Sequence, residues 1–257
     1  MFINNGTSEG IAPQVEFPKI DQRWEYSAEG KNFRVYDFNT KEQTTVDALN
    51  IEFIAIGSDF MCINKWDMNH GYIGSGVIPT VPTGLPTPQT PIKEQQRWSA
   101  VWSINVGVYD KTEEKYKSVD LGNYNQLKEK YGSSYYVVIY ALKDNQFIEI
   151  RLKGKTKTYF WEFLSASRSS LTTKHVKVSE LEEVKIKKDT YYLPKFALGS
   201  DIDKKVLPTC EEKGKELQRF IETFKEKQLY YMGIDQEVEA AEEVFADETI
   251  SPEDLPF

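Results

Sequence analysis

Alternation of apolar and polar residues predicts several β-strands along the chain. Residues 97–108 carry Trp98, Trp102 and Val108 on one face and polar side chains such as Asn105 on the other, which is the pattern of a half-buried strand. Runs rich in aromatic and β-branched residues predict further extended segments at residues 24–38, 51–66, 155–164 and 190–198.

Two neighbouring apolar runs predict a β-hairpin. Residues 134–142 and 146–152 flank the short segment Lys143-Asp144-Asn145, which is the arrangement of two antiparallel strands joined by a short turn.

Helical spacing is clearest near the C-terminus. Residues 209–232 place Leu217, Phe220 and Phe224 on one side, which predicts an amphipathic helix that ends at Gly233. Thr209 and Glu212 match the capping-box spacing. A shorter helix is expected at residues 123–131.

These elements predict a domain plan. We expect a flexible N-terminal arm at residues 1–20, a β-barrel domain at 21–207, a C-terminal helix at 208–233 and an acidic tail at 234–257. Five prolines in residues 79–91 predict a loop inside the barrel domain. Strands with short connections and few helices favour a mainly β fold with α additions, of the five-stranded OB type with insertions.

Negative charge is concentrated in the last part of the chain. The net charge is −8, yet residues 235–257 hold nine acids and no Lys or Arg, which leaves 31 acids against 32 Lys and Arg elsewhere. The body is therefore close to neutral, and one of its faces can still be basic. An acidic tail with few apolar residues is typical of a disordered segment.

Composition argues against several other classes of protein. Cys62 and Cys210 suit a reducing compartment, and two histidines with two separate cysteines give no zinc spacing. Nucleotide-binding and hydrolase motifs are absent from the sequence. We therefore expect no metal, no cofactor and no enzymatic activity. Neither a signal peptide nor a run of about 20 apolar residues is present, which favours a soluble, cytoplasmic protein.

A segment that mixes cations and aromatics is the main candidate for binding. Residues 147–161 read FIEIRLKGKTKTYFW, with cations at every second position around Gly154. Cations follow nucleic-acid phosphates and flat aromatics stack on bases, so this mixture suits single-stranded DNA. The candidate contacts are Phe147, Arg151, Lys153, Lys155, Lys157, Tyr159 and Trp161.

The geometry of the turn at Gly154 leaves two alternatives open. A two-residue turn puts Tyr159 and Trp161 on the apolar face, whereas an odd-length turn puts Phe147, Trp161 and the cations on one face. Arg168, Lys174 and Lys177 follow in a Ser/Thr-rich stretch, which suits either an arm that closes on a phosphate backbone or a polar surface loop. Trp98 and Trp102 are expected in the core.

The final residues, Ser251-Pro252-Glu253-Asp254-Leu255-Pro256-Phe257, resemble the C-terminal tip of bacterial single-stranded DNA-binding proteins. In those proteins, acids precede an Ile-Pro-Phe end, and Leu255 stands here in place of the Ile. Phage proteins of the T7 type have a similar layout of OB barrel, C-terminal helix and acidic tail with a terminal aromatic.

The resemblance implies a function for the tail and for the whole chain. Phe257 would enter an apolar pocket of a partner and Pro256 would keep the approach extended. Glu253 and Asp254 would steer the tail toward a basic rim, with Leu255 in the place of the Ile. The expected function is sequence-independent binding and protection of single-stranded DNA, with recruitment of replication or recombination proteins through the tail. If the protein is encoded by a phage, it would act in the cytoplasm of the host cell. Two alternatives remain: a β-rich adaptor or virion protein that does not bind DNA, and a metal-dependent DNA-processing enzyme. The sequence does not decide whether the chain forms a homo-oligomer.

Overall fold

A computed structural model describes residues 15–67, 71–75, 77–79, 103–110, 115–123 and 134–231. Its strands are β1 (Gln22–Ser27), β2 (Asn32–Asp37), β3 (Gln43–Asp47), β4 (Glu52–Asp67), β5 (Gly71–Ser75), β6 (Ile78–Pro79), β7 (Ser103–Asp110), β8 (Lys115–Asn123), β9 (Ser134–Lys143), β10 (Gln146–Lys153), β11 (Lys174–Ile186) and β12 (Asp189–Asp201). The helices are α3 (Gly154–Ser167) and α4 (Leu207–Tyr231), with short 3₁₀ turns η1 (Ala48–Asn50) and η2 (Arg168–Ser170).

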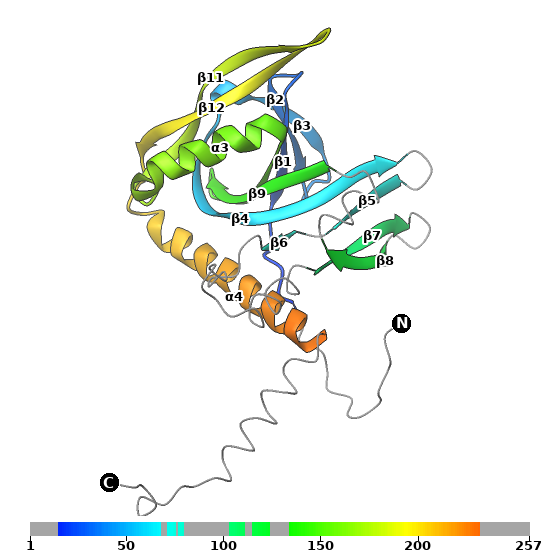
Figure 1. Cartoon of the computed structure of the whole chain (residues 1–257). Coiled ribbons are helices and arrows are strands. Elements are labelled where there is room, and N and C mark those ends of the chain that lie inside the picture. Colours follow the sequence, from blue (N-terminus) through cyan, green and yellow to red (C-terminus); the bar gives the residue numbers. More distant parts are fainter. Residues whose placement is uncertain are drawn as a thin grey trace, which may run out of the picture.

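The fold is mainly β, as predicted, and its sheet curls into a half-barrel (Figure 1). The strands run in the order β3-β2-β1-β10-β9-β4-β5-β7-β8, and the β11–β12 hairpin joins through the start of β4. β1 and β10 pair in parallel, and the other pairs are antiparallel. The described strands number twelve rather than five, because the chain adds β1–β3 before β4 and β5–β8 between β4 and β9.

The predicted hairpin at β9 and β10 is confirmed, with Gln146 paired to Lys143. Asp144 and Asn145 both have positive φ, at 51° and 64°, which is the geometry of a type I′ turn. The extended segment predicted at residues 51–66 is confirmed as β4, whose register against β9 shifts on both sides of Gly57.

The predicted strand at 155–164 is wrong, because these residues form α3. Gly154 adopts a φ of +59° and turns the chain out of β10 into the helix. The helix then buries Thr156 and Phe160, four residues apart, and Phe160 meets Phe196 of β12 with ring centroids 5.0 Å apart. Both hairpin registers considered around Gly154 are therefore wrong.

The C-terminal helix is confirmed as α4, although it begins at Leu207. Thr209 thus lies inside the helix, and the predicted capping box is wrong. Pro208 occupies the first turn, where a missing N–H costs little. Residues 15–20, expected in a loose arm, lie against α4: the Phe17 and Phe220 rings are 5.2 Å apart, and Glu16 N–H donates to Thr223 Oγ1.

Several predictions fall outside the described residues. They concern residues 1–14, the proline-rich loop beyond Pro79, residues 97–102 with Trp98 and Trp102, the helix expected at 123–131 apart from Asn123 of β8, and the tail from 232 onward. Among the described helices, none has the length and apolarity needed to cross a membrane.

Two apolar cores lie on opposite faces of the sheet. The first fills the curve of the half-barrel, where Phe33, Phe53, Ile139 and Ile150 pack with Phe160 of α3. The second lies on the other face, which we call the outer face, where Phe60, Tyr140 and Phe147 pack with Leu217 and Phe220 of α4. The charged side chains of β1 and β10 share this outer face with the second core.

Candidate nucleic-acid interface

Strand alternation puts charged and aromatic side chains on the outer face of β1, β2 and β10. Trp24, Tyr26, Phe33 and Val35 point into the first core, so their neighbours point outward. Register then aligns the outward residues across strands, because Arg23 faces Tyr36 and Glu149, while Glu25 faces Arg34 and Arg151.

Two aromatic rings and an arginine form what we call the aromatic platform: Arg23, Tyr36 and Phe38. The rings of Tyr36 and Phe38 meet edge to face, with centroids 5.0 Å apart and an 81° angle between planes. The Arg23 guanidinium carbon lies 5.2 Å from the Phe38 ring centroid. Both aromatic residues are 36% exposed, which is high for large apolar side chains in a strand or directly after one.

A buried carboxylate holds Arg23. Glu149 is 2% exposed and its Oε1 accepts from Arg23 Nε at 3.1 Å and also from Arg151 Nε. Arg151 is itself buried. Buried charges need such pairing, because an isolated ion loses its hydration without compensation. Nearby, burial raises the pKa of the Cys62 thiol to about 11, so this cysteine stays protonated and unreactive at neutral pH.

Lysines and tyrosines gather where β10 passes into α3. Lys153 Nζ donates to the Tyr136 hydroxyl at 3.3 Å, and Lys157 Nζ lies 4.3 Å from the Tyr135 ring centroid. The Tyr136 hydroxyl donates in turn to Glu25 Oε1 at 3.0 Å, which links this group to β1. We call Lys153, Lys155 and Lys157 the lysine cluster; Lys153 and Lys155 are exposed and Lys157 is half-buried.

The lysine cluster was predicted as part of the binding segment, and the structure brings its members to one end of α3. Phe147 and Arg151 were predicted beside them but are buried, so their assignment as DNA contacts is wrong. Phe147 faces the second core, where its ring stacks on Tyr140 with centroids 5.6 Å apart. Arg151 forms a buried ion pair with Glu149.

Tyr159 and Trp161 lie on α3, away from the outer face. The Tyr159 hydroxyl donates to Glu182 Oε2 at 3.0 Å, and this hydrogen bond raises its pKa. Trp161 packs against the first core. The predicted single face carrying these two residues with Phe147 and the cations is therefore wrong, because a helix rather than a strand follows Gly154.

The remaining predicted cations lie at the other end of α3. Arg168 is exposed in η2, Lys174 pairs with Asp201 at 2.8 Å, and Lys177 is exposed on β11. Arg168 follows Lys157 by 11 residues, a distance of about 16 Å along the helix. Lys174 and Lys177 belong to β11, so both alternatives, the arm and the polar surface loop, are wrong for these two residues. Residues Glu253, Asp254, Leu255, Pro256 and Phe257 lie outside the described part of the chain.

The sequence-based prediction missed Arg23, Arg34, Tyr36 and Phe38. A signal existed, since charged or tyrosine side chains alternate with buried residues over 22–27 and 32–37. The pairing of β1 with β10 joins residues more than 120 positions apart, and local patterns do not reveal such a contact.

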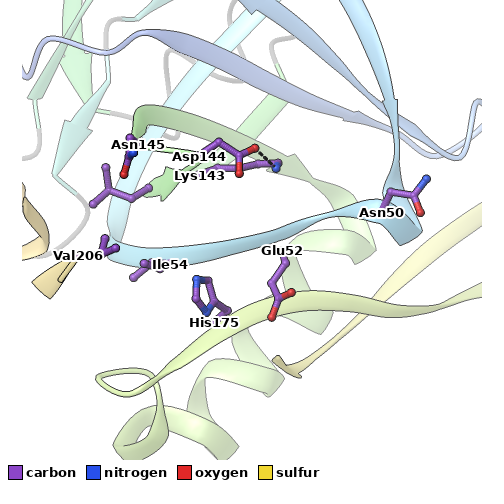
Figure 2. Close-up of a pocket in the computed structure, with 9 residues that line it drawn as sticks. Asn50, Glu52, Ile54, Lys143, Asp144, Asn145, His175 and Val206 are labelled. Carbon is purple, nitrogen blue, oxygen red and sulfur yellow. Dashed lines mark hydrogen bonds and ion pairs between the residues drawn. The ribbon is translucent and has the colours of Figure 1, made fainter. Parts of the chain in front are cut away.

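A separate polar cleft has a volume of about 380 Å³ (Figure 2). It is lined by Asn50, Glu52, Ile54, Leu142, Lys143, Asp144, Asn145, His175 and Val206. Within the described residues, no three His, Cys, Asp or Glu side chains are grouped so that they could hold a metal ion.

No protein-family model matches this chain, and no curated protein or solved structure is similar to it.

Proposed function

We propose that the protein binds single-stranded DNA without sequence preference through the outer face of β1, β2, β9 and β10. The observation that carries this proposal is the aromatic platform, in which Tyr36 and Phe38 offer half-exposed rings beside the Arg23 guanidinium. Each base stacked on an aromatic side chain contributes about 1–3 kcal/mol, and every base has a flat face, so stacking does not select a sequence.

The lysine cluster supplies the second element that single strands require. Lysines that neutralise phosphates release counterions, and this release dominates sequence-independent affinity. Lys153 lies on the outer face beside Tyr136, and Arg34 is exposed on the same face of β2. A strand that crosses from β2 to the start of α3 would therefore meet aromatic rings first and ammonium groups afterwards.

The connections of the strands support an OB-type interpretation of the barrel. β4 pairs with both β9 and β11, and α3 lies between β10 and β11. OB folds bind oligonucleotides on the face of their second and third strands, which correspond here to β9 and β10. The chain departs from this plan at β1, which lies beside β10 and opens the barrel.

We also propose that Glu253–Phe257 serve as a ligand for replication or recombination proteins. A proline-stiffened, phenylalanine-ended peptide loses little entropy on binding, and its acids favour a partner with a basic rim. A chain truncated after Gly233 should still bind DNA, and more tightly, because it loses nine acids.

Fluorescence anisotropy with labelled oligo-dT and with duplex DNA tests the proposal. We expect the wild-type chain to prefer oligo-dT, and the double variant Tyr36→Ala/Phe38→Ala to bind it at least tenfold more weakly, from the loss of about 1–3 kcal/mol per stacked base. Phe17→Ala is the matched control, since Phe17 is an exposed aromatic that packs on α4 instead.

Two results would count against DNA binding. If the wild-type chain does not bind oligo-dT at low salt, the function is an interaction role without nucleic acid. If it binds but Phe17→Ala weakens binding as much as the platform variant, DNA lies elsewhere on the protein.

A further inference from the structure

The polar cleft lies where four parts of the chain meet: the start of β4, the β9–β10 turn, the start of β11 and the residue before α4 (Figure 2). Its apolar lining consists of Ile54, Leu142 and Val206. Nearly all its remaining side chains carry oxygen or nitrogen atoms able to accept hydrogen bonds, which distinguishes it from the cation-rich interface.

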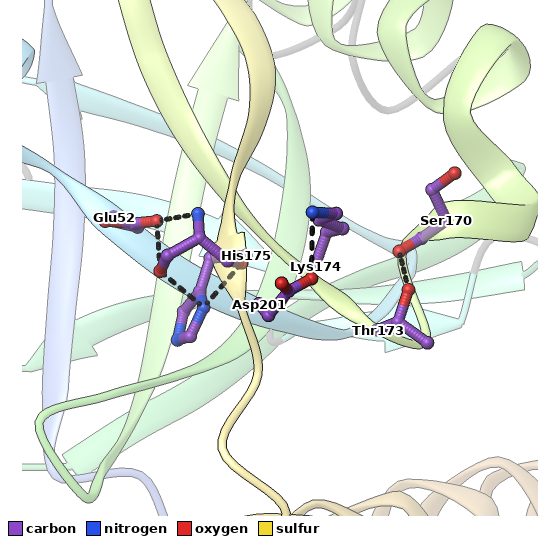
Figure 3. Close-up of polar contacts among 7 residues, drawn as sticks. Glu52, Ser170, Thr173, Lys174, His175 and Asp201 are labelled. Carbon is purple, nitrogen blue, oxygen red and sulfur yellow. Dashed lines mark hydrogen bonds and ion pairs between the residues drawn. The ribbon is translucent and has the colours of Figure 1, made fainter.

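The contacts of His175 with Ser200 determine which nitrogen of the ring carries the proton. Figure 3 draws the polar contacts around His175 and Glu52. His175 Nδ1 lies 3.2 Å from the Ser200 carbonyl oxygen, and a carbonyl oxygen only accepts hydrogen bonds. Nδ1 therefore carries the proton, and in the neutral ring Nε2 carries the lone pair. Because His175 lines the cleft, this places an acceptor there.

Glu52 orients Ser200 in turn. Its Oε1 accepts from the Ser200 backbone N–H at 2.5 Å and from the Ser200 hydroxyl at 2.7 Å. These two hydrogen bonds, the backbone one first, lower the pKa of Glu52, so the cleft contains a carboxylate at neutral pH. The Ser200 hydroxyl, having donated to Glu52, can only accept from His175 Nδ1 at 3.2 Å, which agrees with the same ring protonation.

Charge in the cleft favours a cation. Glu52 and Asp144 are acids, and the lining contains one ammonium group, Lys143, which pairs with Asp144 at 2.5 Å. Asn50 and Asn145 add side-chain carbonyls. Two carboxylates against one ammonium leave the lining net negative, which disfavours a phosphate or carboxylate ligand. The described His, Cys, Asp and Glu residues are not grouped closely enough to hold a metal ion.

We propose that this cleft binds a primary alkylammonium group, with the ammonium at Glu52 and His175, the methylene stem along Ile54, Leu142 and Val206, and Asp144 adding negative charge at the edge of the cleft. An aliphatic stem with a charged head matches a cleft that is apolar on one side and rich in acceptors on the other. A volume of about 380 Å³ lies within the range of small-ligand sites. The site does not depend on DNA binding, because its charge is opposite to that of the interface.

Nuclear magnetic resonance of the full-length protein, read at the His175 side chain, tests the site. The chain has two histidines, His70 and His175, so a His70→Gln variant assigns the signals. We expect the nitrogen shifts to show a protonated Nδ1, and n-butylammonium to shift the His175 signals saturably. Neutral n-butanol has the same stem and serves as the matched probe, which should leave them unchanged.

Asp144→Asn removes one charge and keeps the turn, because asparagine tolerates the positive φ of 51° at this position. We expect it to weaken butylammonium binding about threefold, as for an exposed ion pair. Asp189→Asn, at the exposed start of β12, is the control and should have no effect.

Two further probes identify the source of the ammonium group. Tighter binding of spermidine than of N-acetyl-lysine amide supports a free polyamine, and the reverse order supports a lysine side chain of a protein. The proposal is overturned if butylammonium causes no saturable shift, if butanol shifts the same signals equally, if Asp144→Asn and Asp189→Asn behave alike, or if the proton lies on Nε2.

Discussion

Glu149 and Arg23 form an ion pair in which one partner is buried and the other reaches solvent: the carboxylate is almost inaccessible, while the arginine side chain is 35% exposed. The hydrogen bond engages Nε of Arg23. The opposite edge of the planar guanidinium therefore points away from Glu149, and the same group lies near the Phe38 ring. Glu149 thus connects the buried part of the sheet to the aromatic platform.

Glu149 could act on DNA binding in two ways, by lowering the positive charge of the interface or by holding Arg23 beside Phe38, and replacing it separates the two. Glu149→Gln raises the net charge by one, which by itself would tighten binding to oligo-dT. We expect the opposite, a loss of about tenfold, because Arg23 is no longer held beside Phe38. The measurement is anisotropy at constant salt, and in an Arg23→Ala background the substitution should no longer weaken binding.

The same variant should be less stable. Removing one partner of a buried ion pair leaves Arg151 without its carboxylate, at a cost of about 3 kcal/mol in the free energy of unfolding. Urea unfolding measures this cost, and binding is compared at a temperature where both proteins are folded. Tighter DNA binding by the folded Glu149→Gln variant would show that Glu149 only neutralises charge.

The lysine cluster should determine part of the salt dependence of binding. Each phosphate contact on a single strand contributes about 0.7 to the slope of log affinity against log salt. Lys153→Ala and Lys155→Ala should each lower the slope by that amount. Lys215→Ala, an exposed lysine on α4, is the control. Equal slopes for all three variants would place the phosphates away from the start of α3.

Local signals in the sequence predicted the elements that local chemistry determines. Asp144 and Asn145 favour the positive φ values of the β9–β10 turn, and the stripe of Leu217, Phe220 and Phe224 marks α4. For α3, the abundance of β-forming aromatics outweighed a helical pattern that was also present. Thr156 and Phe160 are both buried while Thr158 between them is exposed, which fits a helix and not a strand, where all three would share one face.

The interface was harder to predict for a different reason. The lysine cluster was found from its composition, but Arg23, Tyr36 and Phe38 reach it only through the parallel pairing of β1 with β10. Nothing near residue 23 indicates a partner near residue 149. Burial of Phe147 likewise depends on α4, which comes from another part of the chain, whereas Arg151 pairs with Glu149 two residues away on its own strand.

Gly199 is required because Glu52 lies against it. A Cβ atom at position 199 would lie 2.2 Å from Glu52 Oε1, so Gly199→Ala must displace the carboxylate from Ser200. We expect a loss of about 1 kcal/mol in the free energy of unfolding, at the low end for overpacked positions, because the atom that has to move is the end of a flexible side chain. Adding Glu52→Ala should recover part of it, since the clash disappears with the side chain.

Gly214→Ala is a matched control, because here an added methyl group should raise the free energy of unfolding and not lower it. Gly214 lies inside α4, and an added Cβ would meet nothing within 4 Å. Alanine should therefore stabilise the protein by roughly 0.5–1 kcal/mol through its helix propensity. Urea unfolding of both variants measures the difference. Similar effects at the two positions would contradict the close packing of β12 on Glu52.

The hydrogen bonds of Glu52 predict how stability depends on pH. Its pKa in the folded protein lies below the ordinary value of 4.5, chiefly because of the Ser200 backbone N–H and then the Ser200 hydroxyl. The unfolded chain therefore binds a proton at higher pH than the folded one does. The stability contributed by this carboxylate is present above the unfolded value and is lost as pH falls through the folded one.

Urea midpoints measured between about pH 6 and about pH 3 test this dependence. Ser200→Ala removes the hydroxyl hydrogen bond and should flatten the decline in stability at acid pH, and Glu52→Gln should flatten it further. Ser179→Ala is the control, because the Ser179 hydroxyl donates to the Lys195 carbonyl and not to a carboxylate. If Ser200→Ala and wild type lose stability equally over this interval, the Ser200 hydroxyl does not hold Glu52 in its charged form.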